Sequence, residues 1–157
     1  MANLVYNIFR RKIYSGEIAW NDDTTVRALL VDNSSTYTPA IDHQTIAQMK
    51  NLGLVELSTE TGYRRATIPD KVVGEVEVNG QPRVALLGGP AQFGAIDPDI
   101  TIKAIVLFVR VGTTDQDSVD FPIAYIDDSP NLPKVTDGGV VLWNPTSNGY
   151  MRIGPCS

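Results

Sequence analysis

The chain has 157 residues, of which 43% are hydrophobic and 20% charged, with 13 Lys and Arg, 18 Asp and Glu and one Cys. A single β-rich domain over residues 1–157 is the default for this length, and it folds without needing disulfides or a metal. A net charge of −5 argues against nucleic acid and anionic lipid as partners, because both require a basic surface. The longest apolar run, residues 104–109, is too short to cross a bilayer.

The first predicted element is an amphipathic helix near the N-terminus. Its apolar face consists of residues at helical spacing: Leu4, Val5, Ile8, Phe9 and Ile13. Arg10, Arg11 and Lys12 suit the negative end of the helix dipole, and residues 15–16 supply a stop. We expect this face to pack on the sheet of the same chain.

A strand is predicted at residues 26–31, with a turn at residues 32–35. A short second helix is predicted at residues 43–50. Asp42 is a good N-cap for it, because a carboxylate accepts the free amides of the first turn, and Gly53 supplies a left-handed exit.

The rest of the chain predicts strands, because Val, Ile and Thr dominate its apolar positions. The predicted strands are residues 54–57, 72–78, 83–87, 100–111, 121–126, 140–143 and 150–153. Asn79 and Gly80 predict a hairpin between the second and third of these, and the second half of residues 100–111 is expected to be buried on both faces. The predicted fold is mainly β, a sandwich or partly closed barrel of about seven to nine strands with an N-terminal amphipathic helix and one short second helix.

Motifs that carry chemistry are missing from the sequence. It contains no nucleophile elbow, zinc-protease motif, paired-cysteine motif or glycine-rich phosphate loop. His43 is the single histidine, and a surface role at a helix end is favoured over a role as base or metal ligand. Cys156 is interpreted as a spectator thiol. We therefore expect no enzyme activity and no cofactor.

Clusters of carboxylates leave two alternatives open. Asp115, Asp117 and Asp120 supply oxygen ligands for Ca²⁺ if backbone carbonyls complete the shell, although a solvated turn is the simpler interpretation. A glycosidase would use two carboxylates facing each other across a cleft, and the candidates come from two groups: Asp97 and Asp99, Asp127 and Asp128. Sequence spacing alone does not show such convergence.

Several segments, in the same order along the chain, resemble a family of small virion structural proteins of tailed bacteriophages. They are MANLVYNIFRRKIYSGEI, TVRALLVDNSSTYTP with the Asp-His helix after it, GYRRATIPDKVV, ITIKAIVLFVRVG, FPIAYIDD and GGVVLWNPTSNGYMRI. Residues 75–94 depart from the family pattern and are more elaborated. The resemblance implies a particle-attached protein, with no catalytic residues.

Three functions follow from these observations. The leading hypothesis is a non-enzymatic virion protein that decorates or cements the capsid, binding the major capsid protein or another virion protein as a homo-oligomer. The alternatives are a tail- or fibre-associated module that binds host-surface saccharide, and a small hydrolase. The expected contact residues lie on the first helix and beside the polar loop at residues 144–149: Tyr6, Arg10, Arg11, Trp143 and Tyr150.

Overall fold

The computed structural model describes residues 3–128, 132–144 and 151–153, the last three as backbone alone. The chain is mainly β, with 39% strand and 12% helix. Its strands form antiparallel sheets that do not close into a barrel. The strands are Leu4–Val5 (β1), Thr25–Asp32 (β2), Ala66–Thr67 (β3), Val72–Val78 (β4), Gln81–Leu87 (β5), Ala91–Ala95 (β6), Thr101–Arg110 (β7), Phe121–Ile126 (β8), Lys134–Val135 (β9), Val140–Trp143 (β10) and Met151–Ile153 (β11). The predicted fold class, in its sandwich-like form, is therefore confirmed.

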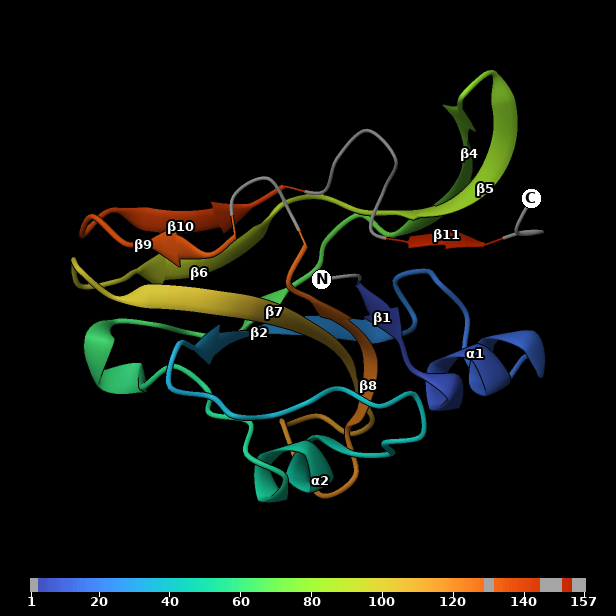
Figure 1. The fold of residues 1–157 in the computed structure, drawn as a ribbon. Helices are drawn as coiled ribbons and strands as arrows, with labels where there is room; N and C mark the ends of the chain where they lie inside the picture. The colour runs from blue at the N-terminus through green and yellow to red at the C-terminus, as the bar shows by residue number, and fades with distance from the viewer. Residues whose placement is uncertain (1–2, 129–131, 145–150, 154–157) are drawn as a thin grey trace.

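The largest sheet has the order β1-β8-β7-β2-β3, with β9 added beside β7. Two smaller sheets, β10-β6 and β11-β5-β4, complete the strands. Figure 1 shows β6 and β10 on one side of β7 and β2, and the helix α2 (Ile46–Asn51) on the other. The central strands are thus covered on both faces.

That double covering explains the apolar runs. Within β7 the residues from Ala104 to Val109 are all buried, as is every residue of β8. Because neighbouring residues of a strand point to opposite faces, such a run requires packing on both sides. The prediction of a doubly buried second half for residues 100–111 is confirmed for residues 106–109, whereas Arg110 is partly exposed and Val111 is exposed.

The hairpin of β4 and β5 extends away from the main sheet (Figure 1). Asn79 and Gly80 form its turn, with φ angles of 52° and 76°. Both central residues of this two-residue turn need a positive φ, which Asn and Gly tolerate best, so the predicted hairpin is confirmed. Most residues of β4 are exposed, because little of the core lies beneath it.

The N-terminal helix is shorter than its apolar stripe predicts. Helix α1 is Asn7–Tyr14, while Leu4 and Val5 form β1 and pair with Tyr125 and Ala124 of β8. Pairing with the sheet edge satisfies their backbone groups, and the helix begins only after Tyr6. Ile8 and Phe9 are buried as expected, so this part of the prediction is confirmed.

The second helix begins three residues later than predicted. Its N-cap is Thr45, whose hydroxyl accepts the Gln48 N–H at 3.1 Å, so the assignment of Asp42 as the cap is wrong. The amides of Ile46 and Ala47 donate to the carbonyls of Asp120 and Asp117, far away in the sequence. Gly53, with φ 104°, follows the end of the helix as predicted.

Several strand predictions need correction, and the two-residue strands β3 and β9 were not predicted. Residues 54–57 form no strand, and only an isolated bridge joins Glu56 to Val31. Strand β6 was not predicted, because Ala91–Ala95 contains no β-branched residue and follows two glycines and a proline. No helix in the described part of the chain is long and apolar enough to span a membrane.

Candidate functional site

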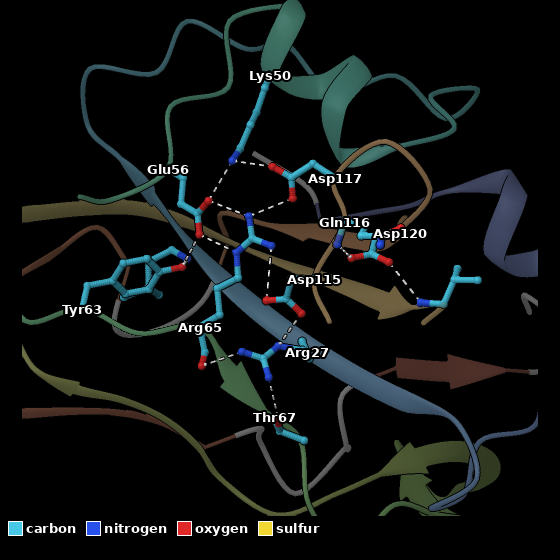
Figure 2. Close-up of polar contacts among 12 residues, drawn as sticks. Arg27, Lys50, Glu56, Tyr63, Arg65, Thr67, Asp115, Gln116, Asp117 and Asp120 are labelled. Atoms are coloured by element: carbon cyan, nitrogen blue, oxygen red, sulfur yellow. Dashed lines mark hydrogen bonds and ion pairs between the residues drawn. The ribbon is translucent and has the colours of Figure 1, made fainter. Parts of the chain in front are cut away.

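The densest group of ionised side chains lies where α2, β2, β3 and the loop between β7 and β8 meet (Figure 2). We call this group the charge cluster, and its members are Arg27, Lys50, Glu56, Arg65, Asp115 and Asp117. It contains three cations and three carboxylates, so its charges balance.

Glu56 is the most heavily bonded carboxylate of the charge cluster. The Arg65 guanidinium donates to both of its oxygens, each at 2.7 Å. Lys50 Nζ donates to Oε1 at 2.9 Å and the Tyr63 hydroxyl to Oε2 at 2.7 Å. Because both side chains of the Glu56–Arg65 pair are largely buried, water competes little with these bonds.

The loop between β7 and β8 is attached through its two aspartates. Asp117 accepts from Lys50 at 2.7 Å and from Arg65 at 3.0 Å. Asp115 lies 3.1 Å from Arg27 Nε and 3.5 Å from Arg65 Nη1. The Arg65 guanidinium also lies 5.2 Å from the centre of the Phe108 ring. The charge cluster therefore fastens this loop to α2 and the main sheet.

The pKa values of the charge cluster favour a structural role. Burial alone would raise the pKa of Glu56, but the hydrogen bonds and charges of Arg65 and Lys50 lower it to about 2. Burial likewise opposes the charges of Arg65 and Lys50, yet their carboxylate partners raise both pKa values. Proton transfer near neutral pH needs a group that titrates there. These three groups do not.

Asp120 stabilises the same loop by accepting hydrogen bonds from two of its backbone amides. Its side chain is fully buried and accepts the Val111 amide at 3.0 Å and the Gln116 amide at 2.7 Å. The oxygens of Asp115, Asp117 and Asp120 therefore already have cationic or amide partners within the protein. Among the described residues no three His, Cys, Asp or Glu side chains converge as metal ligands, and the arrangement does not favour the Ca²⁺ alternative.

The single histidine belongs to a second polar group inside the protein. The Tyr6 and Tyr37 hydroxyls are 2.8 Å apart, and Tyr37 Oη lies 2.6 Å from His43 Nδ1. Burial raises the pKa of Tyr6 and of Tyr37, and raises that of Tyr125 to about 12. The phenols are therefore neutral at physiological pH, and the chain of hydrogen bonds holds residues 37–43 against the start of α1.

The expected contact residues are scattered by the structure. Tyr6 is fully buried, so its side chain is not available to a docking partner. Arg10 and Arg11 are exposed on α1, and Trp143 is partly buried at the end of β10. Tyr150 lies outside the described residues. The two arginines are thus the pair that lies together on an accessible surface.

The two carboxylate pairs of the hydrolase alternative lie near one end of the β7–β8 pair. Asp97 and Asp99 precede β7, and Asp127 and Asp128 follow β8. The amides of Asp127 and Asp128 donate to the Asn3 side chain, at 3.2 and 3.0 Å. The described geometry shows no acid and nucleophile facing each other there.

The charge cluster was not predicted from the sequence. Its members come from positions as distant as Arg27 and Asp117, and folding brings them together. The spacing of Asp115, Asp117 and Asp120 was the one local signal, and it was interpreted as a solvated turn with Ca²⁺ binding as the alternative. The cations that these aspartates meet are arginine and lysine side chains. We found no family model, curated protein or solved structure that matches this chain.

Proposed function

We propose that the chain is a non-enzymatic virion structural protein that decorates or cements the capsid of a tailed bacteriophage. The observation that supports this best is the hairpin of β4 and β5, which extends from the body and exposes apolar side chains. Val72 and Val73 are 54% and 58% exposed, and Val84 is 40% exposed. By the strand register, Val73 and Val84 lie on one face of the hairpin and Val72 on the other, so both faces expose apolar area. Exposed apolar area on a projecting element is typical of a protein contact.

The edge of the hairpin adds to this argument. β4 is the outermost strand of its sheet, so in the described part of the chain its outer backbone edge has no strand beside it. Glu75 and Glu77 are exposed on β4, and such charges hinder indiscriminate strand pairing. The hairpin is thus suited to bind a specific partner protein and not to pair with any exposed strand.

The lattice of a capsid supplies that partner many times over. A small interface of about 1,000 Å² binds weakly by itself. When the protein is an oligomer, linked copies engage neighbouring subunits together, and binding strengthens through effective concentration. The resemblance to small phage virion proteins supports this choice of partner over other protein assemblies.

Mutation of the exposed valines tests the proposal. We expect the double variant Val72→Ser/Val73→Ser to bind about tenfold more weakly to capsids assembled without the protein, measured by co-sedimentation. The control is Leu52→Ser/Val55→Ser, which removes two other exposed apolar side chains, 51% and 40% exposed, near α2. Equal binding by both variants and the unmodified chain would contradict docking through the hairpin. Failure of the unmodified chain to bind capsids, with binding to host-surface glycans instead, would overturn decoration.

Helix α1 offers a second contact surface. Arg10 and Arg11 are both exposed there, and neither forms a salt bridge in the described residues. Replacing both with Gln should weaken capsid binding and reduce its dependence on salt if α1 docks. Unchanged occupancy would leave the hairpin as the docking element and exclude α1.

A further inference from the structure

A groove of about 620 Å³ lies between α1 and the end of β7. We call it the α1–β7 groove, and its lining includes Lys12 and Ile18 near the end of α1, Thr25 of β2, and Arg110 and Val119 around the β7–β8 loop. It is separate from the charge cluster, with which it shares no lining residue. Its walls combine apolar side chains with groups that donate hydrogen bonds.

Arg110 stands out among the lining residues. Its Nε is buried and has no hydrogen-bond partner, and in the described part of the chain no carboxylate pairs with its guanidinium. Arg27 and Arg65, in the charge cluster, both have carboxylate partners. A guanidinium stays charged at any physiological pH, so a half-buried one without an acceptor is unfavourable. Because Nε itself is buried while Arg110 as a whole is partly exposed, an anion in the groove would reach the terminal nitrogens of this guanidinium and balance its charge.

Of the other charged side chains that line the groove, Lys12 and Glu17 pair with each other. Lys12 donates to Glu17 at 2.8 Å and lies 5.3 Å from the centre of the Phe121 ring. Asp23 lines the groove without an ion pair to a described cation. Thr25 lies directly opposite Arg110 in the β2–β7 register, so a hydroxyl accompanies the guanidinium. Arg110 is therefore the group available to an incoming anion.

We propose that the α1–β7 groove binds an acidic peptide segment of a partner protein, with Arg110 holding a carboxylate of that segment. A guanidinium matches a carboxylate with two parallel hydrogen bonds. Ile18 and Val119 offer contacts to apolar side chains beside the carboxylate. A polyphosphate fits less well, because Glu17 and Asp23 repel its several negative charges more strongly than the single charge of one carboxylate. This site goes beyond the proposed function and does not depend on it.

The test follows the Arg110 Nε–H signal by ¹H–¹⁵N NMR in the full chain. The probes are acetyl-Val-Glu-Val-amide, the same peptide with Gln in place of Glu, and inorganic phosphate. We expect a saturable shift with the Glu peptide, in the millimolar range. We expect binding about tenfold weaker with the Gln peptide, because a hydrogen bond to a charged group is lost. Arg110→Gln should abolish the shifts of groove residues, while Arg10→Gln, which removes a charge outside the groove, should not.

Three results would overturn the proposal. They are equal shifts with the Glu and Gln peptides, groove shifts that persist in Arg110→Gln, and saturation by phosphate with no response to the Glu peptide. If Arg110→Gln does not fold, the comparison of the Glu and Gln peptides still decides, because the Nε–H signal of the unmodified chain responds to binding at the same guanidinium. Capsid binding by the Val72→Ser/Val73→Ser variant is a separate measurement, so failure of one proposal does not imply failure of the other.

Discussion

Arg65 bonds to Glu56 and Asp117 and forms an ion pair with Asp115, so one side chain joins three carboxylates. Replacing it removes the positive charge that allows Glu56 to stay ionised while buried. We expect Arg65→Met to lower the free energy of unfolding by about 3 kcal/mol, as for breaking a buried ion pair. Urea unfolding measures the change. The matched control is Glu17→Gln in the exposed Lys12–Glu17 pair, which should be neutral. An equally small effect of both variants would contradict the structural role of the charge cluster.

The lowered pKa of Glu56 predicts a particular pH dependence of stability. The folded-state pKa of about 2 lies below the ordinary value of 4.5, so the stabilisation is present above pH 4.5 and is lost as the pH falls towards 2. The shift corresponds to about 3 kcal/mol. Glu56→Gln should be less stable at neutral pH and should show a smaller decrease between pH 4.5 and 2. Parallel pH profiles of the two proteins would exclude this assignment.

Among the elements, the β7–β8 loop and α2 depend on each other. Asp120 holds the loop through two backbone amides, and the loop carbonyls accept the first amides of α2. Asp120→Ala removes the charged acceptor of two partly buried hydrogen bonds, which should cost about 2 kcal/mol. Hydrogen exchange at Ile46 and Ala47 should become faster at the same time. The control is Ser118→Ala, which changes an exposed side chain of the same loop. Equal exchange rates at Ile46 and Ala47 in both variants would contradict the dependence of α2 on the loop.

The elements that the sequence predicted well are those whose local pattern agrees with their packing. The bounds of β4, β8 and β10 match the predictions, because their apolar or β-branched residues fill sheet positions. The start of α2 could not be predicted, since the loop carbonyls that accept the amides of Ile46 and Ala47 lie about seventy positions further along the chain. The charge cluster was missed for the same reason. Ion pairs between residues distant in sequence leave no periodic pattern.

At the scale of the whole molecule, the buried charge cluster and the projecting hairpin occupy different places. The charge cluster lies on the α2 side of the main sheet, and the hairpin of β4 and β5 extends from the opposite side (Figures 1 and 2). The buried cluster gives the body a fixed shape, and a rigid module loses little entropy when it docks. This separation supports an assembly protein whose contacts lie outside its stable body.

The most direct test of capsid decoration is the copy number of the protein in purified virions. Quantitative mass spectrometry, normalised to the major capsid protein, provides it. We predict a simple fraction or multiple of the capsid protein, because a decorating protein occupies equivalent lattice positions. A count that equals the tail or vertex proteins, or the absence of the protein from the particle, would contradict the proposed function.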